Sequence, residues 1–146
     1  MKRMLIFSVC LLFSQMAKAQ LESFVGEWHV VDFSINMKSL NDDGTVDSTW
    51  VDHHSDKQQL EEDGSVWELD FHQNGEVIQV SNMRTGEIES WGGTYELDKN
   101  TLQLNLVVEG RTRSLLYSFE FKDGVLFLTR SNPKGTMRIL TQFNKD

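Results

Sequence analysis

The chain has 146 residues, of which 39% are hydrophobic and 25% charged, and its 22 acidic residues outnumber its 14 basic ones. This length suits one domain with a hydrophobic core of its own. The net charge of −8 at pH 7 disfavours binding to nucleic acids and to anionic membrane surfaces, because both present negative phosphates. We interpret the acidity as a source of solubility.

Residues 1–19 have the pattern of a secretory signal peptide. Two basic residues near the start precede an apolar run over residues 4–13, and Ala17-Lys18-Ala19 has the small-x-small form at which signal peptidase cleaves. The apolar run is too short for a permanent membrane span. We therefore expect residues 1–19 to be removed and residues 20–146 to form one exported domain, without an integral membrane segment, in the periplasm or outside the cell.

Removal of the signal peptide would also change the composition of the mature chain. It takes away Cys10, the only cysteine, together with three of the 14 basic residues and none of the 22 acidic ones. The mature chain would then have no disulfide and no thiol chemistry. An exported domain without cysteine is more typical of a bacterial envelope compartment than of a disulfide-stapled secreted protein.

The first part of the mature chain predicts a β-hairpin. Apolar residues alternate with polar ones over residues 29–37, with Trp28 and Val30 on the opposite face. A turn sequence at residues 41–44 follows, and residues 45–52 are predicted to be the returning strand. Residues 53–62 are polar apart from Leu60 and predict a solvated loop or a frayed helical turn.

Seven further strands are predicted, separated by turn sequences rich in glycine, asparagine and aspartate. Ile78 and Val80 mark the expected apolar face of the second of these strands, and Gly92-Gly93 predicts a bend or bulge in the third. The predicted strands cover residues 67–72, 76–83, 87–97, 101–108, 114–121, 125–130 and 136–143.

About eight or nine antiparallel strands joined by tight turns favour an all-β fold, a single up-and-down β-barrel. An open meander of this kind would leave two unprotected edge strands, and closure into a barrel removes them. A two-sheet sandwich is the alternative. Sandwiches need long crossover connections, and only residues 53–64 could supply one here.

The beginning of the first strand carries a resemblance to a known family. Gly26-Glu27-Trp28 looks like the G-x-W motif that opens the first barrel strand of lipocalins. The layout of residues 24–143 is similar to that of the small lipocalin-like proteins exported by Bacteroidetes-type bacteria. The resemblance implies a calycin barrel whose closed end is covered by the tryptophan, packed against an arginine from the far end of the chain. We expect Arg138 in that role, with Arg130 as the alternative, and any ligand at the opposite, open end.

The alternation within the predicted strands also indicates which side chains face the barrel interior. The interior could hold a small apolar molecule, with tyrosine hydroxyls orienting it. It could equally be filled by its own aromatic side chains, leaving an envelope structural or protein-interaction module whose function lies on the rim or in the acidic segment at residues 38–64. The predicted ligand-binding residues are Trp67, Phe71, Trp91, Tyr95, Leu104, Tyr117 and Phe119, and Phe127 is expected to face inward as well.

Other chemistry has little support in the sequence. His53 and His54 are adjacent, so on a strand they would point to opposite faces and could not bind one ion. Glu68 and Asp70 lie on the polar face of their strand and are expected to be solvated. Residues 20–146 contain no G-x-S-x-G and no H-E-x-x-H motif. We therefore predict no metal site, no cofactor and no enzymatic activity.

Overall fold

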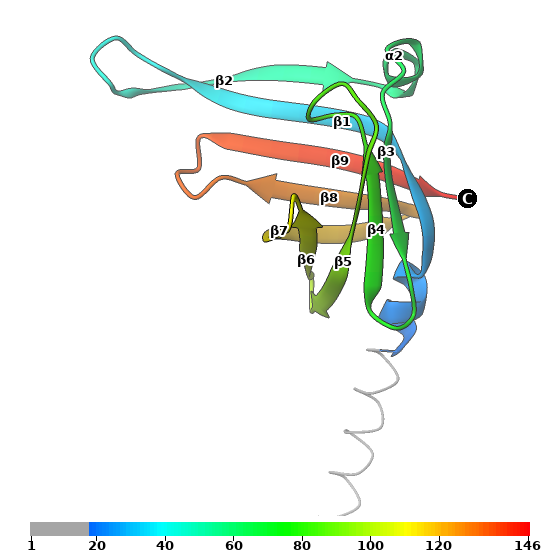
Figure 1. The fold of residues 1–146 in the computed structure, drawn as a ribbon. Helices are drawn as coiled ribbons and strands as arrows, with labels where there is room; N and C mark the ends of the chain where they lie inside the picture. Colours follow the sequence, from blue (N-terminus) through cyan, green and yellow to red (C-terminus); the bar gives the residue numbers. More distant parts are fainter. Residues whose placement is uncertain (1–17) are drawn as a thin grey trace, which may run out of the picture.

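The computed structural model describes residues 18–146, and the predicted signal peptide lies almost entirely outside this range. Within it, a helical segment at residues 18–24 is followed by nine strands and the short helix α2 (Figure 1). No helix among the described residues combines the length and the apolar character needed to cross a bilayer. The elements are β1 (Gly26–Leu40), β2 (Val46–Ser55), α2 (Lys57–Glu62), β3 (Trp67–Phe71), β4 (Glu76–Ser81), β5 (Glu89–Asp98), β6 (Thr101–Val108), β7 (Arg111–Lys122), β8 (Val125–Ser131) and β9 (Met137–Lys145).

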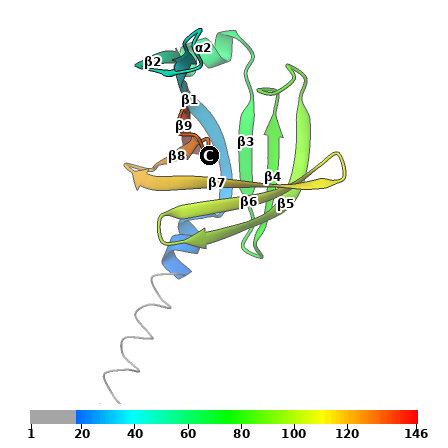
Figure 2. The ribbon, with the colours of Figure 1, turned by 90° about the vertical axis from the view of Figure 1, so that its left-hand side faces the viewer.

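Eight of these strands form a closed antiparallel barrel. From β3 to β9 each strand pairs with the next one along the chain, and β1 pairs with both β3 and β9. The predicted all-β up-and-down barrel is therefore confirmed, and the sandwich alternative is wrong because the β1–β9 pairing closes the sheet. Figure 2 shows β3 and β4 crossing the direction of β6 and β7, as expected for a small, strongly twisted barrel.

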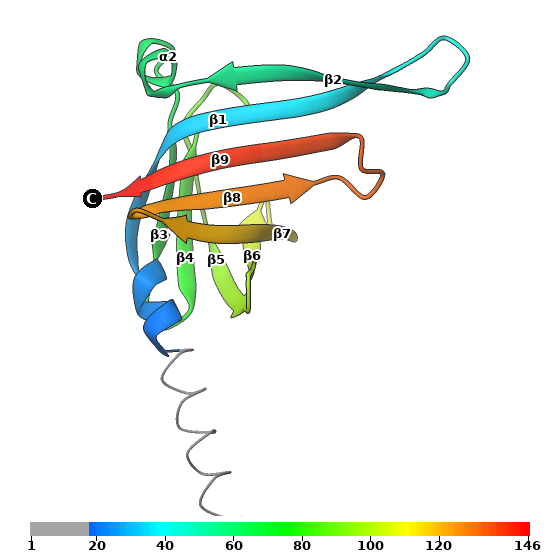
Figure 3. The same cartoon turned by 180° about the vertical axis from the view of Figure 1, so that it is seen from behind.

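Strand β1 holds the barrel together because it has three partners. Gly26 to His29 pair with β3, Phe33 to Leu40 pair with β2, and the other edge pairs with β9. A register shift between Val30 and Asp32 marks a β-bulge where the strand bends away from β3 (Figure 3). In a regular strand Trp28 and Phe33 would lie on opposite faces. The bulge reverses the alternation between them, so both side chains pack against the core.

Strand β2 and helix α2 lie outside the barrel, at the end away from the N-terminal helical segment (Figure 1). The predicted returning strand is longer than expected, because β2 extends through His53 and His54 to Ser55. Of the two alternatives predicted for residues 53–62, the solvated loop is wrong and the helical turn is the closer one, since α2 is a capped helix. Asp56 accepts a hydrogen bond from the backbone N–H of Gln59 at 2.9 Å, and Leu60 is 3% exposed.

Strand β5 contains the predicted glycine pair. It runs through Gly92 and Gly93 with regular pairing to β4, so the expected bulge is not formed there. Gly93 instead pairs with both β4 and β6, at Val77 and Leu106. A Cβ atom at Gly93 would lie 1.9 Å from the carbonyl oxygen of Asn105. The absence of a side chain therefore permits the close approach of β5 and β6.

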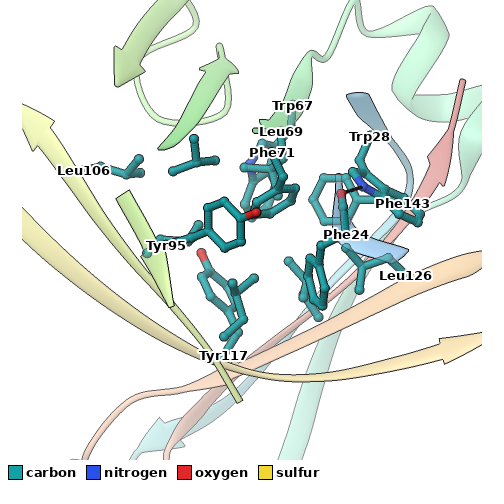
Figure 4. Close-up of a cluster of buried hydrophobic side chains, with 14 of the residues drawn as sticks. Phe24, Trp28, Trp67, Leu69, Phe71, Tyr95, Leu106, Tyr117, Leu126 and Phe143 are labelled. Carbon is teal, nitrogen blue, oxygen red and sulfur yellow. Dashed lines mark hydrogen bonds between the residues drawn. The ribbon is translucent and has the colours of Figure 1, made fainter. Parts of the chain in front are cut away.

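The closed half of the barrel is filled with aromatic side chains (Figure 4). Phe24, from the helical segment, is fully buried. Its ring makes edge-to-face contacts with Phe71, Phe119 and Phe121 at centroid distances of 5.3, 4.8 and 4.9 Å. This is a preferred geometry for aromatic pairs. The helical segment thus inserts a plug into one end of the barrel.

Trp28 covers the same end, as predicted, but its cationic partner differs. The buried indole N–H donates a hydrogen bond to the carbonyl oxygen of Phe24 at 2.8 Å, and the Lys145 ammonium lies 5.3 Å from the ring centroid. Gly26 has a φ of +123°, and a Cβ there would lie 2.7 Å from Cε of Lys145. Gly26 therefore allows the lysine side chain to cross the strand toward Trp28.

The predicted role of Arg138 at this end is wrong. In the antiparallel register of β1 with β9, Lys145 is opposite Trp28, whereas Arg138 is opposite Asn36. Seven residues of strand separate the two cations, about 23 Å at 3.3 Å per residue. The Arg138 guanidinium lies instead over the ring of Trp50, 5.2 Å from its centroid. The alternative, Arg130, lies in the open half of the barrel and does not meet Trp28 either.

Candidate ligand-binding cavity

The open half of the barrel contains a cavity of about 350 Å³. Its walls come from β1 and from β3 to β9, at the ends of the strands farthest from Trp28. Aromatic and aliphatic side chains make up most of the lining, with a few polar and cationic groups among them. The lining residues are Phe33, Ile35, Trp67, Gln79, Ser81, Met83, Arg84, Trp91, Leu106, Val108, Arg113, Leu115, Tyr117, Arg130 and Ile139.

Three of the seven predicted ligand-binding residues line this cavity: Trp67, Trp91 and Tyr117. They come from β3, β5 and β7, which are brought together only by the barrel.

The other four predicted ligand-binding residues do not line the cavity. Phe71, Tyr95, Leu104 and Phe119 pack in the filled half of the barrel. The Tyr95 hydroxyl donates a hydrogen bond to the carbonyl oxygen of His72 at 2.7 Å, so it is engaged by the closed-end turn. For Phe71 and Phe119 the physical reason is the Phe24 plug, whose ring packs directly against both and occupies the space they would otherwise offer to a ligand. Tyr95 packs in turn against Phe71. The filled-barrel interpretation thus describes one half of the molecule and the cavity interpretation describes the other.

The predicted inward face of β4 is wrong. Ile78 is 39% exposed, whereas Val77, Gln79 and Ser81 are buried. The register explains this, because residues directly opposite one another on paired strands share a face. Leu69 and Phe71 of β3 point inward, and their partners across the ladder are Gln79 and Val77. Val80 shares the outward face with Ile78.

Strand β8 shows the same error. Leu126 and Leu128 are buried, whereas Phe127 is only partly so. The alternating set that includes these two leucines ends at Arg130, which lines the cavity. The predicted inward position of Phe127 is therefore wrong, because the leucines and not the phenylalanine face the core.

Two polar groups of the cavity wall are buried without a partner. Trp67 is 9% exposed and Gln79 is 6% exposed. Within residues 18–146, neither the indole Nε1 of Trp67 nor the Oε1 atom of Gln79 has a hydrogen-bond partner. Unpaired buried polar atoms are uncommon because each one costs the desolvation of its group. Both atoms have almost no accessible surface, so each carries this cost within the wall.

Tyr117 and Arg130 bring a third polar feature to the wall. Burial raises the pKa of the Tyr117 hydroxyl, and the neighbouring Arg130 guanidinium opposes that rise through its charge and a hydrogen bond. The register places them together, since the β7–β8 ladder pairs Ser118 with Thr129, one residue before Arg130. The tyrosine remains a neutral hydroxyl that can donate a hydrogen bond into the cavity.

Arg84 forms part of the rim of the cavity. Its guanidinium lies 5.3 Å from the ring centroid of Trp91. Its Nη2 atom is 2.6 Å from a carboxylate oxygen of Glu89 and 3.7 Å from one of Glu109. These contacts hold Arg84 against the indole and satisfy its charge locally.

Histidine–carboxylate contacts lie outside the cavity, on the outer surface. His29 lies 3.3 Å from Glu68 and 2.8 Å from Asp146. Together with Glu27, His29 and Asp146 bring potential ligand atoms within 4.8 Å of one another. This group is on the solvent side of the closed end, and exposed acidic residues of this kind commonly gather without an ion.

The remaining candidates from the sequence are also on the outside. Asp70 contacts His72 at 2.9 Å. His54 contacts Asp32 at 2.8 Å, and its neighbour His53 occupies the next position of β2, on the other face. Glu68, Asp70 and the histidine pair therefore do not converge on the cavity.

Comparisons with known proteins give likenesses in structure only. No protein-family model matches the chain, and no curated protein matches it. Solved structures that match include a lipocalin-like protein from Bacteroides uniformis, with 14% identity, a TM-score of 0.47 and coverage of 85% of this chain and 99% of that one. An uncharacterized protein from Bacteroides eggerthii has 17% identity, a TM-score of 0.45 and coverage of 84% and 99%. The fluorescent protein UnaG has 14% identity, a TM-score of 0.43 and coverage of 86% and 99%. The closed antiparallel barrel of this chain is established by its own strand pairing.

Proposed function

We propose that this protein binds a small, largely apolar molecule inside its barrel. The observation that carries the proposal is the cavity of about 350 Å³ in the open half, with two indole rings in its wall. Its size falls at the lower end of the range of small-molecule pockets, about 300 to 1,000 Å³. Its composition is also typical of such pockets, in which a mainly apolar lining carries a few placed polar groups.

The division of the barrel into two halves supports this function. Phe24, Phe71 and Phe119 fill the closed half and stabilise the scaffold, so the open half can remain unfilled. A barrel that served only as a structural module would gain stability by filling both halves, because each unfilled volume in a core costs free energy. Retention of the cavity is therefore in keeping with a binding function.

We also propose that the protein is exported and that residues 1–19 are removed. The support is the tripartite pattern of the N-terminal sequence. Cleavage after Ala19 would leave Phe24 in the mature chain, so the plug of the closed end would be retained.

The binding proposal is tested with the neutral fluorescent probe Nile red and a pair of matched variants. Leu115 lines the cavity, whereas its neighbour Leu116 is 60% exposed on the outer face of the same strand. Leu115→Trp places an indole in the cavity and should weaken Nile red binding at least tenfold. Leu116→Trp makes the same chemical change outside and should leave binding unchanged.

Circular dichroism of both variants checks that they are folded, since overfilling a core typically costs about 1 to 3 kcal/mol. Native mass spectrometry of the protein purified from its own host should show a co-purifying apolar molecule, and the intact mass reports whether residues 1–19 are present. Absence of Nile red binding by the unaltered protein, or equal binding by both variants, would contradict the proposed site.

A further inference from the structure

The charge of the cavity wall is opposite to that of the chain. Acidic residues outnumber basic ones by 22 to 14 in the sequence. Among the described residues that line the cavity, however, there are three arginines and no carboxylate: Arg84, Arg113 and Arg130. A cavity that received only neutral apolar molecules would need no cations. The lining therefore indicates a negative charge on the occupant.

The three arginines differ in what already neutralises them. Arg84 has carboxylate partners in Glu89 and Glu109. In the described part of the chain, neither Arg113 nor Arg130 has a carboxylate within salt-bridge distance. Arg113 is exposed, near the start of β7, and solvent satisfies its charge. Arg130 is half-buried in the wall, where water screens its charge less well.

Arg130 is also placed beside a hydrogen-bond donor of the right kind. The Tyr117 side chain is 3% exposed, and the β7–β8 register, which pairs Ser118 with Thr129, places Tyr117 and Arg130 at the next position of the ladder, where both line the cavity. A guanidinium and a phenolic hydroxyl together can hold two oxygens of one carboxylate, sulfate or phosphate group.

We propose that the molecule bound in the cavity is an amphiphile with one anionic group, which binds Arg130 and the Tyr117 hydroxyl while its apolar part contacts Trp67, Trp91 and Leu115. This inference rests on the proposed function, since it specifies the chemical class of the ligand for the same cavity. The anionic group could be a carboxylate, a sulfate or a phosphate, because all three present oxygens to a guanidinium in the same way.

The test compares decanoate with 1-decanol, which have the same chain length and differ in the charge of the head group. Displacement of Nile red from the unaltered protein at pH 7.5 should need at least tenfold less decanoate than 1-decanol, as expected for one charge-assisted contact. Decyl sulfate and decyl phosphate, measured in the same way, rank the three head groups.

The Arg130→Gln variant removes the charge and keeps a polar side chain of similar reach. Its preference for decanoate should fall to less than about twofold, while its affinity for 1-decanol stays unchanged. The matched control is Arg111→Gln, which alters the net charge by the same amount at an exposed position of β7 outside the cavity lining. That control should keep the full preference.

The outcomes separate this inference from the proposed function. If the unaltered protein fails to bind Nile red, the binding function itself is wrong. If Nile red binds but decanoate is not preferred, or if Arg130→Gln keeps the preference, only the anionic ligand is wrong. Should Arg130→Gln not fold, the unaltered protein in about 0.05 M and about 1 M NaCl gives a second measurement. High salt should reduce the preference for decanoate, because it screens charges, and an undiminished preference would overturn the inference.

Discussion

Replacement of Trp28 by alanine should strongly destabilise the barrel. Trp28 is 2% exposed, its indole N–H is bonded to the Phe24 carbonyl oxygen at 2.8 Å, and its ring lies 5.8 Å from that of Phe121. Truncation of a buried tryptophan to alanine typically costs about 3 to 5 kcal/mol, and here it also leaves the buried Phe24 carbonyl without its donor. We expect a loss of about 4 kcal/mol in the free energy of unfolding. For a domain of this size that loss corresponds to a fall of about 15 °C in Tm.

Urea unfolding followed by circular dichroism measures this loss. Trp28→Phe is the matched control, because it keeps a ring over the closed end and removes only the indole N–H and part of the surface. It should lose about half as much stability or less. Its affinity for Nile red should not change, since the cavity is at the other end of the barrel. A loss below about 1 kcal/mol in Trp28→Ala would refute the role of Trp28 as the cover of the closed end.

Two further predictions concern the sheet and its outer surface. Gly93→Ala should lower the free energy of unfolding by about 3 kcal/mol or more, because the new Cβ would meet the backbone of β6. Its control, Gly92→Ala, has nothing within 4 Å of the new Cβ and should be nearly neutral in the same urea titration. Equal losses of stability in the two variants would contradict the argument. The hydrogen bond that the His54 ring donates to the Asp32 carboxylate, followed by the charge of that carboxylate, raises the pKa of His54 above its ordinary value of 6.5. This pair therefore stabilises the fold fully below pH 6.5, and its contribution is lost as the pH rises through the pKa of the folded state. A proton NMR titration should show that raised pKa and its return toward 6.5 in Asp32→Asn, whereas a pKa unaffected by the substitution would rule the pair out.

The sequence predicted strands and their inward faces well where clear alternation of apolar and polar residues was bounded by turn sequences. The strands from β5 to β7 show clear period-two patterns and end at glycine-containing or asparagine-containing turns, so both their existence and their inward faces could be predicted. These patterns, together with the alternation in β3, predicted that Trp67, Trp91 and Tyr117 face the interior, and all three line the cavity. Closure of the barrel followed from the need to protect edge strands, and it did not require knowledge of any single contact.

The prediction of the inward-facing residues was wrong where pairing with a neighbouring strand decides which side chains face the interior. In β4 the hydrophobic residues Ile78 and Val80 point outward, because the turn from β3 sets a register that turns Gln79 and Ser81 inward. Polar residues can take that face because it lines a cavity and not a dry core. Pairing β4 with the clear pattern of β3 across the short turn would have revealed this register.

The cationic groups were missed for a related reason. Arg113 belongs to the same alternating set as Leu115 and Tyr117, and Arg130 to the set of Leu126 and Leu128. Each arginine lies toward the open end of an inward-facing apolar series, which is a signal available in the sequence. Arg138 was assigned to the closed end by its place near the C-terminus, but the register between two long strands decides which residue meets Trp28, and that register depends on a bulge that period-two alternation does not show.

The pairing of β1 with β9 also has a consequence for how the molecule folds. It joins Trp28 to Lys145, residues more than a hundred positions apart, whereas the pairs from β3 to β9 join consecutive strands and can form as hairpins. Contacts of such large sequence separation form slowly, because the entropy of closing the loop must be overcome first. During synthesis one long edge of β1 therefore stays unpaired until β9 has been made. In that interval its free N–H and C=O groups can pair with strands of other chains. We therefore expect this barrel to aggregate mainly while it folds, before β9 has paired with β1.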